Sequence, residues 1–235
     1  MSFEPSDSRR FDAPEIRVGE DARATFLTRT YIHLFGAIIA FVLIEVGLFT
    51  SGLAEPIARS MLSVNWLFIL GGFMIVSWFA SRAAFSAKSM AAQYAALGAF
   101  VVAEALIFVP MLYIANAYAP GAIESAATVT LIGFAGLTAV AFLSRKDFSF
   151  LGGMLKWGLA LALVAIVGGV IFGFNLGTWF SVAMVGLAGA AILYDTSNII
   201  RHFPEDRHVG ASLQLFASVA LMFWYVLRIF VGSRD

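Results

Sequence analysis

Seven long apolar stretches dominate this sequence and restrict the folds open to it. They lie between charged, Gly or Pro positions and cover approximately residues 31–49, 64–80, 91–115, 122–143, 151–174, 178–200 and 208–231. A helix of about 20 mainly apolar residues crosses the hydrocarbon core of a bilayer, which is about 30 Å thick. The stretches therefore predict an all-α integral membrane protein, built as a bundle of seven transmembrane helices.

The composition agrees with a membrane protein and excludes several other classes. Of the 235 residues, 60% are hydrophobic and 13% are charged, which is too little polar surface for a soluble domain of this length. The 15 basic and 15 acidic residues cancel, so no overall field attracts nucleic acid. Cysteine is absent, which excludes disulfides and thiolate metal sites. We expect the lipid bilayer to be the main partner and expect no nucleic acid.

The chain divides into a polar N-terminal tail, residues 1–29, and the bundle, residues 30–235. Pro5 and Pro14 favour an irregular start, whereas residues 15–28 fit either a polar helix on the membrane surface or a disordered arm. The first apolar stretch is too long for a signal-peptide core, so we expect an uncleaved span. Short connections predict antiparallel neighbours in a single compact bundle.

Basic residues gather on one side of the predicted bundle. That side holds eleven of them: Arg9, Arg10, Arg17, Arg23, Arg29, Arg82, Lys88, Arg145, Lys146, Arg201 and Arg207. The other side holds Arg59, Arg228 and Arg234, and Lys156 lies within the fifth span. Because loops rich in Lys and Arg stay in the cytoplasm, we expect a cytoplasmic N terminus and an external C terminus. The compact size, without a Ser-rich leader, favours a bacterial inner membrane over an organelle membrane.

Small residues and one proline indicate how the spans pack. Helices in lipid associate through close contacts of small residues, and the candidates are Gly71 with Gly72, Gly133 with Gly136, Gly169 with Gly173, and Gly186 with Gly189. Pro110 removes a backbone donor from the third span, so we expect a kink there.

Three acidic residues lie inside predicted spans, where each costs about 2.5–3.5 kcal/mol unless a partner or water compensates. Glu45 lies near the outer end of the first span, and Glu104 lies near the centre of the third, before Pro110. Asp195 lies roughly 9 Å from the cytoplasmic end of the sixth span, with Asn198 on the same face. Each is either a packing contact or a group whose protonation is coupled to function.

The search for a catalytic site finds no constellation. His33, His202 and His208 lack the spacing of metal ligands, and no phosphate-binding loop or nucleophile elbow is present. We expect no enzyme activity, no cofactor and no resident metal.

Three motifs resemble the Bax inhibitor-1 family, also called the transmembrane Bax-inhibitor-motif family. Residues 144–152, Ser-Arg-Lys-Asp-Phe-Ser-Phe-Leu-Gly, resemble the family's basic loop between the fourth and fifth spans. Residues 192–200, with Leu-Tyr-Asp-Thr-Ser-Asn-Ile-Ile, resemble its sixth-span motif, and residues 212–230 resemble its last helix. Residues 105–112 around Pro110 are a weaker match.

The resemblance implies a last helix that is central and surrounded by the other six. In calcium-leak members, an Asp of the sixth span pairs with an Asp of the last span, and an Arg of the second helps to close the pathway. Asp195 matches the first Asp, Arg82 is the nearest match to the Arg, and Ser218 stands where the second Asp is found. A Ser hydroxyl can hydrogen-bond Asp195 but cannot share a proton as a second carboxylate does.

Two functions follow from the resemblance. The first, which we favour, is a regulator of other membrane proteins. It would modulate a membrane-anchored AAA+ protease or a stress response. The alternative is a pH-sensitive leak channel for Ca²⁺ or other cations, gated at Asp195. The candidate pathway residues are Asp195, Ser218, Arg82, Glu104 and Asn198.

Overall fold

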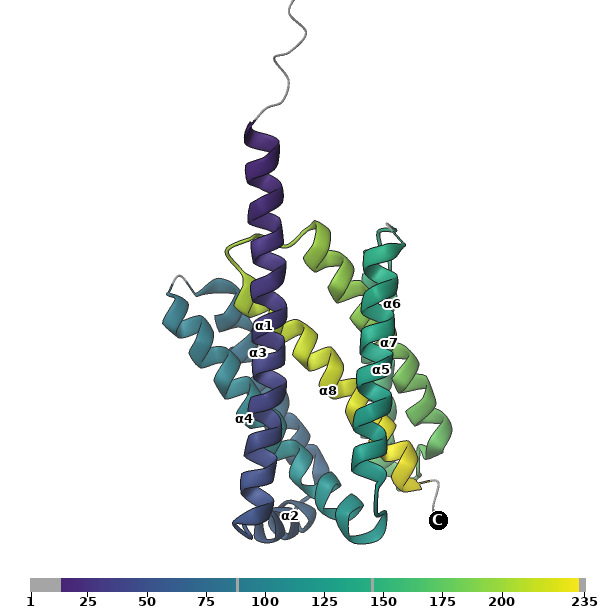
Figure 1. The fold of residues 1–235 in the computed structure, drawn as a ribbon. Coiled ribbons are helices and arrows are strands. Elements are labelled where there is room, and N and C mark those ends of the chain that lie inside the picture. Colours follow the sequence, from purple (N-terminus) through teal and green to yellow (C-terminus); the bar gives the residue numbers. More distant parts are fainter. Residues whose placement is uncertain (1–13, 88, 145, 233–235) are drawn as a thin grey trace, which may run out of the picture.

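The computed structural model describes residues 14–87, 89–144 and 146–232, with side chains from residue 21 onward. This part of the chain forms eight helices and no strand (Figure 1): α1 (Pro14–Thr50), α2 (Ala54–Leu62), α3 (Trp66–Ser86), α4 (Met90–Tyr118), α5 (Ala122–Leu143), α6 (Leu151–Phe172), α7 (Gly177–Arg201) and α8 (His208–Gly232). All except α2 are long and apolar enough to cross a membrane, which confirms the seven predicted spans. Pro5, Arg9, Arg10, Lys88, Arg145 and Arg234 lie outside the described residues.

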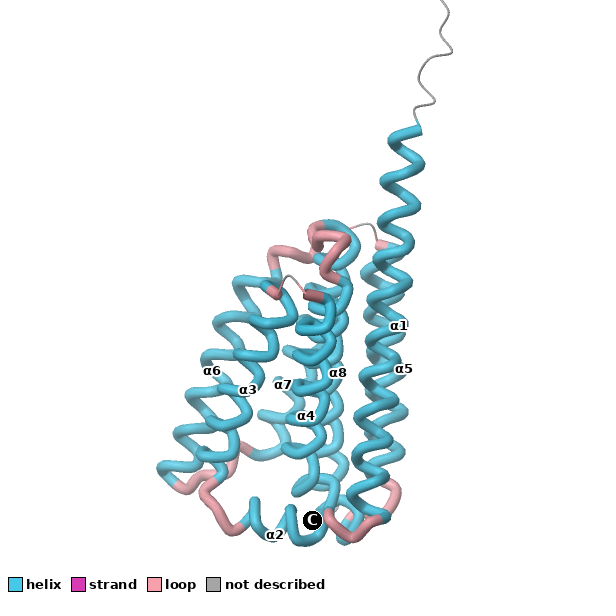
Figure 2. Tube along the Cα trace, turned by 90° about the vertical axis from the view of Figure 1, so that its left-hand side faces the viewer, coloured by secondary structure: helices cyan, strands magenta, loops and turns pink. Residues whose placement is uncertain are grey.

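Helix α1 continues through the region that the sequence left open between a surface helix and a disordered arm. Residues 15–28 are helical and run without a break into the first span. Both views show the N-terminal part of α1 extending beyond the ends of the other helices (Figures 1 and 2). The first span is therefore the membrane portion of a longer rod.

Helix α2 is a short element that the search for apolar stretches of membrane-spanning length did not predict. It buries Ala54 and Ala58 against Val109 of α4, while Glu55 and Arg59 form an exposed ion pair of 2.6 Å on its other face. With 9 residues it is too short to span a bilayer. It lies at the same end of the bundle as the last turn of α8 (Figure 1).

Helix α8 forms the core of the bundle. It packs against α1, α3, α4, α5 and α7, and its side chains Leu213, Leu215 and Leu227 are almost fully buried. Helix α6 instead packs on α7 and α3, so among the described residues α8 is enclosed by five spans instead of the six expected. The last helix is nonetheless the central one, as the resemblance implied.

Close helix packing uses some of the predicted glycines and one that was not predicted. A Cβ on Gly189 would lie 3.3 Å from Leu137, and one on Gly133 would lie 3.4 Å from Met222, so both face a neighbouring helix. Gly71, Gly72, Gly136, Gly173 and Gly186 face open space, so the prediction of a helix contact is wrong for these five, and Gly169 meets Phe174 and Leu176 just after the end of its own helix. At Gly210, a Cβ would lie only 3.2 Å from the carbonyl oxygen of Ala84, so α3 and α8 approach closely there and a side chain would force a neighbour to shift.

Helix α4 remains helical through Pro110. The proline is buried and helps to line a cavity beside α8. Proline cannot donate to the carbonyl oxygen of Leu106, so the ladder of helix hydrogen bonds lacks one bond there.

Candidate functional site

Asp195 is the most buried acidic side chain in the described bundle, with 3% of its surface exposed. Helix α7 directs it toward α8, where both carboxylate oxygens find donors. The Gln214 amide donates to Oδ1 and the Ser218 hydroxyl donates to Oδ2, each at 2.5 Å. The carboxylate thus joins α7 to α8 through two hydrogen bonds, and such bonds to a charged acceptor are stronger than neutral ones.

The two donors come from one face of α8. Gln214 and Ser218 are four residues apart, so they lie one above the other on a helix. Ser218 was expected to face Asp195, but Gln214 was not predicted because it lies outside the position at which the family's second Asp is found. Its spacing of four residues before Ser218 was the available signal. We call Asp195, Gln214 and Ser218 the polar lock.

Asn198 and Arg82 lie outside the polar lock. Asn198 is half-buried one turn further along α7, where its carbonyl oxygen accepts from the backbone N–H groups of His202 and Phe203 at the helix end. The exposed Arg82 guanidinium lies over the Trp78 ring, 5.5 Å from its centroid. Within the described residues, no basic side chain forms an ion pair with Asp195, so Arg82 does not hold it here.

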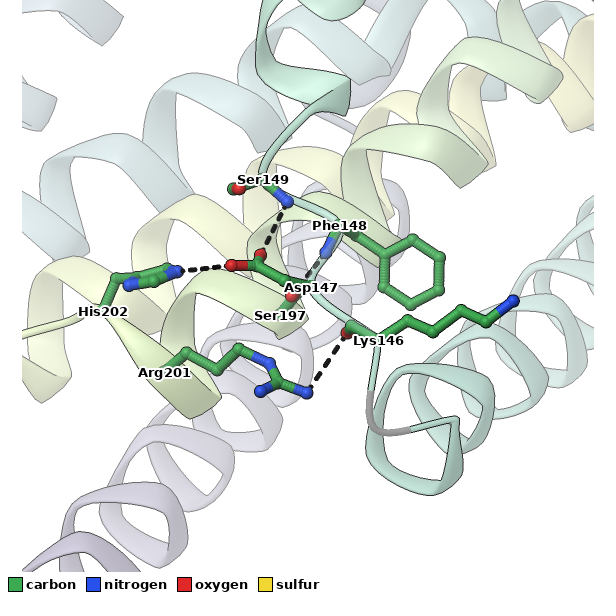
Figure 3. A network of polar contacts seen from close by, with 7 residues as sticks. All are labelled: Lys146, Asp147, Phe148, Ser149, Ser197, Arg201 and His202. Carbon is green, nitrogen blue, oxygen red and sulfur yellow. Dashed lines mark hydrogen bonds and ion pairs between the residues drawn. The ribbon is translucent and has the colours of Figure 1, made fainter.

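A second polar network fastens the loop between α5 and α6 to the end of α7 (Figure 3). The Phe148 N–H donates to the Ser197 hydroxyl oxygen at 3.0 Å, and Arg201 donates to the Lys146 carbonyl oxygen at 3.3 Å. One oxygen of Asp147 accepts from the Ser149 N–H at 2.9 Å, while the other lies 3.1 Å from Nε2 of His202.

The electrostatics of this loop follow from the same contacts. The Ser149 N–H, and after it His202, hold the pKa of the Asp147 carboxyl below its usual value because both stabilise the charged form. Ser197 lies two residues after Asp195, so the loop network and the polar lock belong to one stretch of α7. Two of the sequence motifs, residues 144–152 and 192–200, therefore meet in space.

The chain matches a known protein family over most of its length. The model of the family described as "Inhibitor of apoptosis-promoting Bax1" matches residues 23–235, nearly the whole chain. The protein belongs to the Bax inhibitor-1 family. Its motifs had indicated this membership, and the match confirms it.

Individual relatives of this Bax inhibitor-1 protein come from bacteria and plants. The "Modulator of FtsH protease YccA" of Escherichia coli is 34% identical over 108 residues, which are 45% of this chain and 49% of the relative. The "BI1-like protein" of Arabidopsis thaliana is 36% identical over 110 residues, 43% of this chain and 41% of the relative. The matched part spans about half the length of these curated relatives.

The N-terminal helix of this Bax inhibitor-1 protein is hydrogen-bonded to the end of α7 and to the loop that follows it. Arg23 donates from Nε to the Ile200 carbonyl oxygen at 2.9 Å and from a terminal nitrogen to the Phe203 carbonyl oxygen at 2.6 Å. Phe26 is almost fully buried and stacks on Phe203. Sequence reasoning counted Arg23 only as a basic residue, because nothing local reveals a contact with a loop about 180 residues away.

Two cavities flank α8, and each contains one of the remaining buried acids. Glu104 lines a cavity of about 840 Å³ between α3, α4, α6 and α8, with Arg228, Ser77 and Ser81 also on its wall. Glu45 lines a cavity of about 480 Å³ between α1, α4, α5 and α8. The structure thus separates Glu45 and Glu104 from the polar lock and places each beside open space.

Proposed function

We propose that this protein is an inner-membrane regulator that modulates a membrane-anchored AAA+ protease. The observation that carries the proposal is the similarity to the Escherichia coli protein named a modulator of FtsH protease, combined with membership of the same family. That similarity covers about half of each chain. Separately, the described part of the chain has no group of His, Cys, Asp and Glu arranged to hold a metal.

The projecting end of α1 is the contact surface that we assign to the protease. It extends beyond the other helices (Figure 1), and Arg23 and Phe26 anchor it against the loop between α7 and α8. A rod held rigidly at its base presents a defined surface outside the bilayer without loss of conformational freedom on binding. The same side carries most of the basic residues, which supports a cytoplasmic N terminus.

Co-purification tests the proposal. The intact protein, extracted in mild detergent, should retain an AAA+ protease and slow its degradation of a membrane substrate. Deletion of residues 1–20 removes the projecting end but leaves Arg23 and Phe26 in place, so we expect loss of the protease with an unchanged thermal unfolding midpoint. Retention of the protease by this truncated form, or absence of any protease with the intact protein, would contradict the proposal.

A cation leak is the second candidate, favoured by the cavity that Glu104 lines beside α8. In this function the polar lock would hold α7 and α8 together, and the cavity would hydrate the pathway. Calcium flux into proteoliposomes at pH 6 and pH 8 distinguishes the candidates. A leak channel should show calcium flux in the wild type, and Asp195→Asn should change that flux. A regulator should show no flux in the wild type or in Asp195→Asn, and flux that appears only with Ser218→Asp is compatible with a regulator.

A further inference from the structure

The cavity of about 480 Å³ beside Glu45 is a groove in the side of the bundle. Helices α1 and α5 form its walls, and α4 and α8 form its floor. Both walls pack on α8, and they meet each other at the rings of Tyr31 on α1 and Phe142 on α5, whose centroids lie 6.1 Å apart and which do not line the groove. Val42, Val46 and Leu131 line the groove and are each about half exposed, at 49%, 52% and 46%, so it opens toward lipid between α1 and α5.

The groove contains two buried polar groups that have no hydrogen-bond partner among the described residues. Glu45 is 7% exposed and lines the groove, yet neither carboxylate oxygen accepts or donates a hydrogen bond within the described part of the chain. The Thr130 side chain is 2% exposed, and its Oγ1 is likewise unpartnered. Buried polar groups are almost always hydrogen-bonded, so two exceptions on the facing walls of one groove indicate a missing ligand.

The charge of the lining selects the head group of that ligand. The ionisable residues on the described lining are Glu45 and Glu124, both acidic, and no Lys, Arg or His lies among them. An anionic head would face two acids, whereas an ammonium group offers three donors and a positive charge to Glu45. The rest of the lining is apolar apart from Asn116 and Thr130, so the remainder of the ligand must be a hydrocarbon.

The geometry also orients the ligand. Glu45 lies about 7.5 Å before the end of α1 by helix rise, and Glu124 lies in the first turn of α5. These two helix ends lie on the same side of the bundle (Figure 1), so the acids mark the head-group end of the groove. Phe41 and Phe216 lie further along the same lining, where an alkyl chain follows.

From these observations we propose that the groove binds a membrane-dissolved amphiphile with one long alkyl chain and a primary amine head, held by Glu45. The volume falls in the range of about 300–1,000 Å³ that is typical of small-molecule sites. The ligand enters from the bilayer between α1 and α5 and does not touch the polar lock. The site is therefore independent of the proposed contact with a protease.

Binding of tritiated dodecylamine to the full-length protein in zwitterionic lipid nanodiscs tests the proposal. We expect saturable binding that unlabelled dodecanol displaces about ten-fold less well and that dodecanoate does not displace, because only the amine carries the complementary charge. Glu45→Gln should weaken amine binding about ten-fold and abolish the preference over dodecanol. Glu104→Gln, a matched change in the other cavity, should leave binding unchanged.

Several results would overturn the proposal. They are absence of saturable binding, equal displacement by dodecanoate, and equal affinity of the wild type and Glu45→Gln. Ala127→Phe fills the groove without altering either acid and should abolish saturable binding, so retained binding in this variant is a fourth contrary result. If Glu45→Gln fails to fold, the head-group series on the wild type and Ala127→Phe still decide the question.

Discussion

Asp195 and Glu45 are both buried acids, 3% and 7% exposed, and their surroundings are opposite. Asp195 lies at the interface between α7 and α8, where each carboxylate oxygen accepts a hydrogen bond. Glu45 faces a hollow between α1 and α5, where neither oxygen has a partner within the described residues. Similar burial therefore supports two different roles, because the hydrogen-bonded carboxylate of Asp195 joins two helices, whereas the carboxyl group of Glu45 is available to a ligand.

Of the changes that test this contrast, removal of the Asp195 carboxylate should have the largest effect on the free energy of unfolding. Asp195→Ala leaves the Gln214 amide and the Ser218 hydroxyl without acceptors, and we expect a loss of about 2–3 kcal/mol in the free energy of unfolding. SDS-induced unfolding in mixed micelles measures this loss. Asp195→Asn is the matched control, because it preserves shape and one acceptor oxygen, and it should lose less. Equal stability of Asp195→Ala and the wild type would show that the lock does not stabilise the bundle.

Glu45→Leu should move stability in the opposite direction. The change removes an unpartnered carboxyl group from an apolar wall and adds apolar surface, so we expect a gain of up to about 1 kcal/mol in the same unfolding assay. A loss comparable to that of Asp195→Ala would mean that Glu45 has a partner in the ligand-free protein and would remove the contrast between the two acids.

The two donors of the polar lock should contribute individually and modestly. Gln214→Leu and Ser218→Ala each remove one hydrogen bond, and each should lower the free energy of unfolding by about 1 kcal/mol. Because both bond the same carboxylate, their effects should not add, and a double-mutant cycle should reveal the coupling. Strict additivity in the double variant would indicate that the two bonds form independently.

The smallest effect concerns the loop between α5 and α6. The folded pKa of Asp147 is lowered, so its contribution is present above the unfolded pKa and is lost as pH falls through the folded value. We expect faster exchange of the Phe148 and Ser149 amide hydrogens at acidic pH, after correction for intrinsic exchange. Asp147→Asn should remove this pH dependence, whereas Ser144→Ala should retain it. The same pH profile in Asp147→Asn and the wild type would refute the assignment.

The candidate site illustrates where prediction from sequence succeeded and where it failed. Asp195 and Ser218 were identified because a motif marks them, and they do lie against each other. Arg82 was the nearest match to the Arg of the second span that helps to close the pathway, yet its side chain lies over Trp78. Gln214 and Arg23 were missed as contacts because their partners are tertiary, and a partner 19 or about 180 residues away leaves no local pattern.

Hydropathy by itself determined the seven spans and the class of this protein, because the bilayer imposes a length on any apolar helix and obliges its backbone to bond internally. The sequence also located the three acids inside those spans. Only the tertiary structure decided which acid is satisfied and which glycines face a neighbour. Those outcomes depend on the rotation of each helix about its axis and on its packing partners, and a pattern of apolar residues that is nearly uniform around each helix does not encode them.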